Sequence, residues 1–457
     1  MAGAGNQAIA YNPGTTPIGR GSIPRWRRSA AGFRADAEQK PAPAREDRPD
    51  GGPLPPPCHA HHLVIPSVVC QIRRAMDLTF DADQEGFRAE ARAWLAAHVP
   101  TEPLPPLGTP AGLDAHRAWE AALFAARWSV VHWPVEFGGR DAGIVRWLIF
   151  EEEYARARAP RRVSGAGISL AGAALLEHGR AAQKERFLPP MASGEEIWCG
   201  AWPEPGNHGD LADVRWRAVR NAGGDGWVLN GQRAPVAQGA VAQWCFCILR
   251  SQGDPESRGG LSCFLVALDS RGVTVRPIAP MDGEAGLAEI LFEDVEVPDS
   301  QLLVDRGPGV SIAATVPGAG HGLGLRSAAP LTEAAARLID LFRQRGSPAW
   351  AADAVARAQV NAQATALHAL WTASKAAGGQ LVGPEASCNE IFWSEADVTI
   401  RRTALALLGP EAELLDSGSP DPWLNGYLDA LADQIETGTH QLHHDVVADH
   451  LLGLPQG

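Results

Sequence analysis

Three things are scarce in this sequence: lysine, long apolar runs and regularly spaced cysteines. Only three lysines occur, Lys40, Lys184 and Lys375, so arginine supplies nearly all of the 40 basic side chains, as is typical of GC-rich coding DNA. No apolar run approaches the roughly 18–20 residues of a membrane helix, so we expect no membrane span. Because the seven cysteines are odd in number and show neither a disulfide framework nor a paired CxxC spacing, we expect a reducing cytoplasm as the location.

Charge is distributed unevenly along the 457 residues. Residues 1–75 carry ten Lys or Arg against five Asp or Glu, whereas the rest carries 30 basic and 48 acidic side chains. A body this acidic argues against nucleic acid as a partner. The first 75 residues are rich in Gly, Pro, Ala and Arg without periodicity, and we interpret them as a disordered or mis-called N-terminal extension. Their Cys58, His59, His61 and His62 lie in a proline-rich stretch, so we predict no metal site there.

Hydrophobic periodicity predicts that the rest of the chain has three parts. Helical spacing prevails over residues 76–196, changes to a period of two over residues 197–305, and returns over residues 306–457. We therefore predict an α+β chain with an N-terminal helical domain, a central β domain and a C-terminal helical bundle, bounded by these residues.

Local signals predict individual elements within these parts. Asp83 is suited to cap the first helix, and Thr332 and Gly346 are expected to bound a later one. The predicted strands are Val214–Val219, Trp227–Leu229, Trp244–Leu249, Ser262–Leu268, Val273–Pro277 and Glu289–Val295. The longest predicted helices are Ala351–Ala377, Glu385–Leu408 and His440–Leu452.

Six sequence blocks, in this order, resemble the acyl-CoA dehydrogenase family. The segment Trp133–Gly143 (WPVEFGGRDAG) is similar to the family's WPxEYGG block, and LIFEEEYARARAP and QKERFLPPMASGEEIWCG follow it. Gly260–Gly283 and Ile290–Pro298 resemble the central β domain, and PEASCNEIFWSE and LLGLP resemble a bacterial branch. The resemblance covers essentially all of Met76–Gly457. It implies an N-terminal helical domain, a central β-barrel-like domain and a C-terminal four-helix bundle.

The resemblance also implies a function in lipid metabolism. It suggests a flavoprotein oxidoreductase that uses FAD to oxidise an acyl-CoA thioester to its α,β-enoyl form. A carboxylate then removes the α-proton while the β-hydride passes to the flavin, and hydrogen-bond donors stabilise the thioester carbonyl. The implied partners are an electron-transfer acceptor protein and a second subunit, in a homodimer or in a hetero-oligomer with a related dehydrogenase.

The first flavin segment of the family, [ST]-E-P-x-x-G-S-D, resembles residues 203–210. The resemblance assigns FAD contacts to Glu204, Pro205 and Gly206. It assigns contacts with the acyl-CoA to His208 and Asp210.

Four family contacts with the flavin or near it are missing from this sequence. Pro203 and Gly209 replace the two hydroxyl residues of the first segment. In the second segment, which resembles G-x-K-x-W, Pro235 replaces the tryptophan that packs on the flavin, and Ala237 replaces a hydroxyl residue near N5. None of these four side chains donates a hydrogen bond.

The catalytic base of the family is also replaced. One branch carries it at the position of Thr437, and others carry it at the position of Gly322. Neither residue accepts a proton at neutral pH. Glu436 and His321, each one residue away, are the nearest candidates, although a shift of one residue rotates a helical side chain by about 100°.

The C-terminal segment resembles the one that holds FAD across the dimer interface, and this implies contacts from Gly438 and Thr439. Arg345 matches a phosphate-contacting arginine and is expected to reach the FAD diphosphate. His440 and His444 are spaced i and i+4, but no Glu or Cys completes a metal site, so we predict no metal.

Two functions of different classes therefore remain open. In one, the chain is an acyl-CoA dehydrogenase-type enzyme with altered flavin contacts. In the other, it is a non-catalytic subunit that pairs with a competent relative. A third interpretation is a retained fold with different flavin chemistry.

Overall fold

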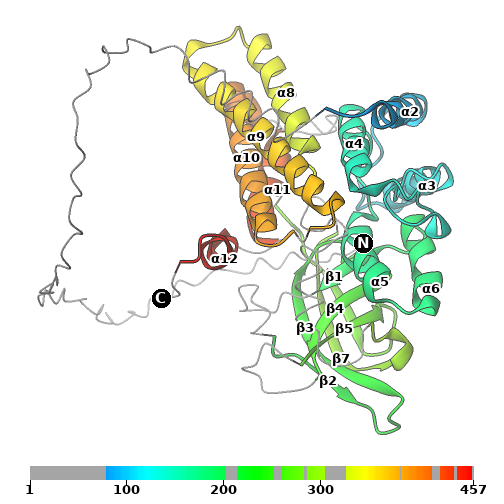
Figure 1. Ribbon diagram of the computed structural model, residues 1–457. Helices are drawn as coiled ribbons and strands as arrows, with labels where there is room; N and C mark the ends of the chain where they lie inside the picture. Colours follow the sequence, from blue (N-terminus) through cyan, green and yellow to red (C-terminus); the bar gives the residue numbers. More distant parts are fainter. Residues whose placement is uncertain are drawn as a thin grey trace, which may run out of the picture. The chain divides into compact units, whose positions relative to one another are not determined.

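The structure is a computed structural model, shown in Figure 1, with three successive groups of elements: helices, strands and helices again. This order confirms the predicted α+β architecture. The residues that it describes are 79–201, 214–251, 260–281, 286–303, 326–380, 382–413, 423–436 and 440–454.

The N-terminal group is helical, as predicted. Its elements are α2 (Ala82–His98), α3 (Pro110–Ala125), the short 3-10 helix η1 (Val135–Phe137), α4 (Gly143–Arg156), the π-helix η2 (Gly167–Gly172), α5 (Ala173–His178) and α6 (Ala181–Ala192). The prediction that Asp83 caps the first helix is wrong, because Asp81, two residues earlier, caps α2. The Asp81 carboxylate accepts from the Gln84 N–H at 2.7 Å, and the Gln84 side chain accepts from the Asp81 N–H, which forms a capping box.

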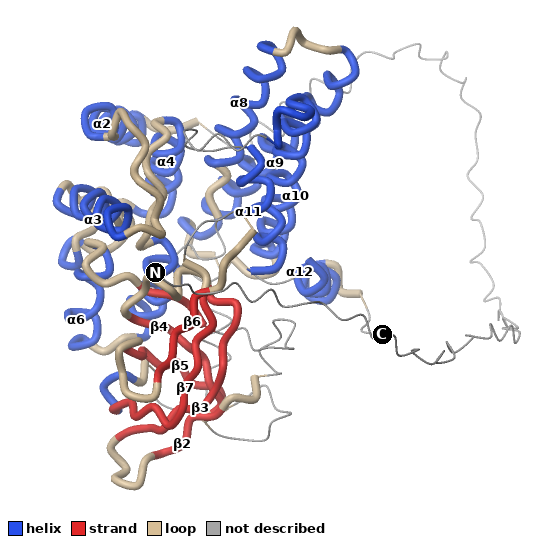
Figure 2. Tube along the Cα trace, turned by 180° about the vertical axis from the view of Figure 1, so that it is seen from behind, coloured by secondary structure: helices blue, strands red, loops and turns tan. Residues whose placement is uncertain are grey.

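The strands form one curled sheet, drawn in red in Figure 2. They are β1 (Trp198–Ala201), β2 (Arg217–Arg220), β3 (Gly226–Val236), β4 (Trp244–Arg250), β5 (Leu261–Ala267), β6 (Val273–Pro277) and β7 (Ala288–Pro298). The order is β1-β4-β2-β3-β7-β6, with β5 paired to β4. The pairs β1–β4 and β2–β4 are parallel, and the remaining pairs are antiparallel. All six predicted strands are present, and β1 is an additional one.

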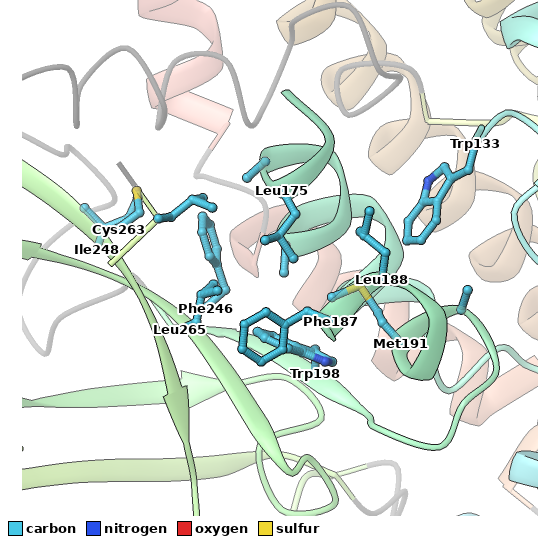
Figure 3. Packing of buried hydrophobic residues seen from close by; sticks show 14 of the residues in the cluster. Trp133, Leu175, Phe187, Leu188, Met191, Trp198, Phe246, Ile248, Cys263 and Leu265 are labelled. Atoms are coloured by element: carbon cyan, nitrogen blue, oxygen red, sulfur yellow. The ribbon is translucent and has the colours of Figure 1, made fainter. Parts of the chain in front are cut away.

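The N-terminal helices and the sheet share a hydrophobic core. Figure 3 shows the centre of that core, where Leu175, Phe187 and Met191 from the helices meet Trp198 and Phe246 from the sheet. The Phe187 and Trp198 rings meet edge to face, with centroids 5.4 Å apart. This core fixes the first strand, β1, against the helices before the chain enters the segment that resembles the flavin motif.

Within the described residues, the C-terminal group contains four long helices and a short final one. They are α8 (Ala329–Gln344), α9 (Ala352–Ala377), α10 (Glu385–Leu408), α11 (Trp423–Glu436) and α12 (His440–Val446), which continues as the π-helix η7 (Val447–Leu451). Short 3-10 helices are η4 (Asp299–Gln301), η5 (Ala349–Ala351) and η6 (Gly409–Glu413). The helix expected to begin at Thr332 begins at Ala329, and α11 was not predicted. Among the described residues, no helix is both long and apolar enough to cross a membrane.

Gly172 offers a test of the packing between η2 and the core. A Cβ atom at this position would lie 2.4 Å from the Trp133 ring, so Gly172→Ala should destabilise the protein by about 1–3 kcal/mol through overpacking. Chemical denaturation monitored by circular dichroism measures this change. Gly86→Ala is the matched control, because nothing lies within 4 Å of the added atom, and it should stabilise helix α2 by about 0.5–1 kcal/mol. Equal effects of the two variants would contradict the packing argument.

Candidate functional site

A buried arginine on the strand that carries the second flavin-like segment joins this strand to β1 and β4. Arg233 on β3 has no exposed surface. Its Nε donates to the Ala201 carbonyl oxygen at 3.2 Å, and a terminal nitrogen donates to the Ile248 carbonyl oxygen at 2.8 Å. These bonds tie β3 to the last residue of β1 and to β4. The segment that resembles the first flavin motif therefore starts from a fixed point.

Three thiols lie beside this arginine and do not contribute reactivity. Cys199, Cys245 and Cys247 are buried and free. Burial raises the pKa of Cys245 and of Cys247 well above the ordinary value, and the nearby Arg233 charge offsets this only in part. Cys245 and Cys247 therefore stay protonated at neutral pH, and we interpret all three buried thiols as packing groups.

The end of β3 presents an apolar surface where the family presents a tryptophan and a hydroxyl. The pairing register with β7 shifts between Arg233 and Val236, and Pro235 and Ala237 on either side of Val236 are exposed. The next residue, Gln238, has a left-handed backbone with a φ of 62°. Its side-chain Oε1 is buried and has no hydrogen-bond partner among the described residues.

These residues fit a flavin in part. Pro235 and Ala237 can pack against a flat ring, but they offer no side-chain donor. The unpartnered acceptor of Gln238 is suited to a ligand N–H, because a buried carbonyl oxygen without a partner is costly. The described edge therefore suits a ring held by packing and by few side-chain hydrogen bonds.

A second cluster lies in the C-terminal helices around Arg326. One terminal nitrogen of this arginine lies 2.7 Å from the Asp433 carboxylate on α11, and the other lies 3.5 Å from the Glu390 carboxylate on α10. The guanidinium also stacks 3.3 Å from the centre of the Trp393 ring. We call Arg326, Glu390 and Asp433 the arginine cluster.

The arginine cluster joins two described residues that lie close in sequence to the two positions at which the family places its base. Arg326 follows Gly322 by four residues, and Asp433 precedes Thr437 by four residues. These segments lie more than 100 residues apart in sequence. No local pattern predicts this pairing, and neither Arg326 nor Asp433 was identified from the sequence.

A buried carboxylate, Asp397, lies next to the arginine cluster on α10. Its Oδ1 accepts from Arg401 Nε at 2.8 Å. Burial raises the pKa of Asp397 to about 6, which exceeds the opposing effect of Arg401, and the Asp433 charge raises it further. The charge of Asp397 therefore changes at mildly acidic pH.

Of the site residues predicted from the sequence, Arg345 is the one that the structure describes with its side chain. It is the C-cap residue that follows α8 and donates to the Glu411 carboxylate at 3.1 Å, and this hydrogen bond raises its pKa. Neither the arginine cluster nor the β3 edge is among its recorded contacts. Its role with FAD stays a prediction.

The remaining predicted site residues are not described in detail. Glu436 is the last residue of α11, and nothing is described of its side chain. The other predicted residues lie outside the described residues: Glu204, Pro205, Gly206, His208, Asp210, His321, Gly438 and Thr439.

The histidines of α12 contact a neighbouring helix. His440 Nε2 lies 2.7 Å from Ser394 Oγ on α10, and the rings of His440 and His444 are 6.1 Å apart. His443 Nδ1 lies 3.2 Å from Ser387 Oγ, also on α10. Within the described residues, no group of three or more His, Cys, Asp or Glu side chains is arranged to hold a metal ion.

The sequence matches three domain families along almost all of its described length. These are the acyl-CoA dehydrogenase N-terminal domain over residues 81–195, the middle domain over residues 199–295, and the C-terminal domain over residues 322–452. Acyl-CoA dehydrogenase IpdE1 of Mycobacterium tuberculosis is 32% identical over 385 residues, which cover 82% of this chain and 98% of that protein.

Two solved structures are similar in fold. The ChsE4-ChsE5 complex from Mycobacterium tuberculosis is 25% identical with a TM-score of 0.70, and the match covers 84% of this chain and all of that chain. A structure described as the Tcur3481-Tcur3483 steroid ACAD is 23% identical with a TM-score of 0.73 over 84% of this chain and 100% of that chain. At this level of identity, the second likeness concerns the fold alone.

The raised pKa of Asp397 predicts a pH dependence of stability. The folded protein binds the Asp397 proton more tightly than the unfolded chain does, so stability should fall as pH rises from about 4 to about 6 and then stay level. The free energy of unfolding should decrease by about 2–3 kcal/mol, because the pKa of Asp397 is higher by roughly two in the folded than in the unfolded protein. The wild type should therefore have a lower urea midpoint at pH 7 than at pH 4. Asp397→Asn should abolish this difference. Asp353→Asn, at an exposed carboxylate on α9, is the control and should leave it intact. An unchanged pH dependence in Asp397→Asn would contradict the assignment.

Proposed function

This chain belongs to the acyl-CoA dehydrogenase family, and from that premise we propose that it is an FAD-dependent oxidoreductase subunit that acts on an acyl-CoA thioester. The observation that carries the proposal is the arginine cluster. It joins Arg326, four residues after Gly322, to Asp433 on α11, four residues before Thr437. Family membership over all three domains supports the same conclusion.

In this proposal, FAD would lie near the ends of β1 and β3, which Arg233 joins, and would supply the hydride acceptor. Arg233 keeps the end of β1 in place, while Pro235 and Ala237 offer a packing surface. Gln238 is the acceptor available to a ligand N–H. We keep Glu204, Pro205, Gly206, Arg345, Gly438 and Thr439 as proposed FAD contacts, and His208 and Asp210 as proposed substrate contacts.

We propose Glu436 as the base that removes the α-proton, with His321 as the second candidate. Glu436 ends α11, one turn after Asp433, which is held by Arg326. A general base must be held within hydrogen-bond reach of the proton that it removes, and this ion pair restrains the helix that carries Glu436. The domain boundaries near residues 196 and 305 are part of the same proposal, as is a cytoplasmic location.

A second candidate function is that of a non-catalytic partner subunit. The exposed Pro235 and Ala237 favour it, because neither offers the flavin a side-chain hydrogen bond. Each lost bond removes roughly 1 kcal/mol, so several losses weaken FAD binding by orders of magnitude. The ChsE4-ChsE5 complex, a relative made of two differently named chains, supports a hetero-oligomer with a related dehydrogenase subunit. In either function, we propose that an electron-transfer protein accepts the electrons.

The flavin content of the purified full-length chain distinguishes the two functions. A stand-alone enzyme should carry close to one FAD per protomer, as measured by visible absorbance after gel filtration. A folded but colourless protein, with native circular dichroism, would contradict the enzyme proposal. Co-expression with a related dehydrogenase chain should then yield a yellow complex that contains both chains.

Glu436→Gln tests the proposed base. Loss of a general base should lower turnover of an acyl-CoA substrate by at least about 100-fold, while FAD content stays unchanged. Reduction of a dye acceptor measures turnover. Glu395→Gln, at an exposed carboxylate on α10, is the control and should keep full activity. Full activity in Glu436→Gln would transfer the role to His321.

A further inference from the structure

Helix α9 carries an exposed apolar stripe. Val360, Ala364 and Leu367 are spaced by four and three residues, so they lie on one face of the helix. Within the described part of the chain, Val360 leaves 64% of its surface exposed and Leu367 leaves 49%. The buried residues of α9 lie on the opposite face, at Val355, Ala358, Ala362, Thr365, Ala369, Thr372 and Ala373. The stripe therefore faces away from the helices against which α9 packs.

Aromatic side chains widen this stripe from α9 onto α10. The His368 ring lies 5.3 Å from the Trp371 ring on the same helix and 5.3 Å from the Phe392 ring on α10. Phe392 is 45% exposed. His368 Nδ1 lies 2.6 Å from Oδ1 of the buried Asn389, so the histidine ring is held in place and has little freedom to lose on association. A continuous exposed apolar surface of this kind marks a contact with another molecule.

The stripe is complementary to itself when two copies of α9 run antiparallel. In a two-fold contact, each residue of one copy meets its counterpart equally far on the other side of the axis. An axis at Ala364 brings two small side chains together, so the helices can approach closely. Val360 then lies next to Leu367 of the second copy. Arg357 lies seven residues before the axis and Trp371 seven residues after it, so a guanidinium meets an aromatic ring.

The charges near the two ends of α9 match in the same arrangement. Asp353 lies eleven residues before Ala364 and Lys375 eleven residues after it, so opposite charges meet at each end of the contact. Within each copy, Asp353 accepts from Arg357 Nε at 2.8 Å, and Lys375 pairs with Glu385. The two copies together therefore form a row of alternating charges at each end. A parallel pair would instead place Asp353 against Asp353 and Lys375 against Lys375, and such like charges repel.

We propose that α9 is a contact surface between two copies of this chain, which pack antiparallel about Ala364. The matched charges favour a second copy as the occupant, because both partners of each ion pair are present on this one helix. The inference goes beyond the proposed function, since it holds for an enzyme and for a non-catalytic subunit alike. A hetero-oligomer would accordingly contain two copies of this chain in contact with each other.

Ala364→Glu tests the contact in the full-length protein. Two like charges would meet at the axis, so the dissociation constant between copies should rise by at least about 100-fold. Sedimentation equilibrium of the wild type should give an even number of protomers, and the variant should give half that number. Because Ala364 is exposed and glutamate is a good helix former, the circular dichroism spectrum should not change. Ala93→Glu, at an exposed position of α2, is the matched control and should keep the wild-type mass.

Ala364→Cys gives a second readout that does not depend on weakening the contact. A short thiol-specific cross-linker should join two copies of this variant into a covalent dimer, because equivalent residues lie close together at a two-fold axis. Ala93→Cys controls for the native cysteines and for random collisions, and it should remain largely uncross-linked.

A wild type that stays monomeric at its highest soluble concentration would overturn the inference. An assembly whose mass is the same in Ala364→Glu, and in which Ala364→Cys does not cross-link, would also overturn it and would indicate another interface. If Ala364→Glu does not fold, cross-linking of Ala364→Cys decides. In a complex with a different chain, the absence of a cross-link between two copies of this chain would equally contradict the proposal. Because no readout depends on FAD, failure of the proposed function leaves this test intact.

Discussion

The buried guanidinium of Arg233 is the constraint on which the arrangement of the central sheet depends. A charge without exposed surface is stable only where hydrogen bonds replace its water, and Arg233 finds carbonyl acceptors on β1, β3 and β4. Because the guanidinium group is planar and rigid, the carbonyl groups of these strands must lie at fixed positions around it. Arg162 acts similarly among the N-terminal helices, where it joins Glu120 to the Ser129 carbonyl oxygen. Arg162 and Arg233 therefore each connect segments that lie far apart in the sequence.

The sequence predicts elements best where periodicity and burial agree. The strand predicted at Val273–Pro277 has the observed bounds, and β4 extends one residue beyond its prediction. In contrast, β3 was predicted as Trp227–Leu229 but continues to Val236. Pro235 signals the end of a strand, yet shifts in the register with β7 accommodate it. Local patterns do not encode such shifts, because they depend on the partner strand.

The candidate site was predictable only where it consists of local motifs. Replacement of the flavin contacts at Pro235 and Ala237 follows directly from the sequence, and the structure describes both as exposed. The arginine cluster was not predictable, because Arg326 and Asp433 are 107 residues apart and neither belongs to a motif. The contact between His440 and Ser394 was not predictable either, because the sequence does not indicate which serine His440 contacts. Tertiary contacts of this kind appear only once the helices are packed.

Only some of the residues help to distinguish the two candidate functions. Arg233 satisfies carbonyl groups inside the sheet, so folding alone requires it, whether or not a flavin binds. The same argument covers the core around Trp198. Retention of these groups therefore shows that the scaffold is kept and says nothing about catalysis. The outward-facing positions are free of that requirement, and two of them, Pro235 and Ala237, carry no side-chain hydrogen-bond donor. A cofactor bound at this edge must rely on packing, backbone groups and the neighbouring segments of the chain or of a partner.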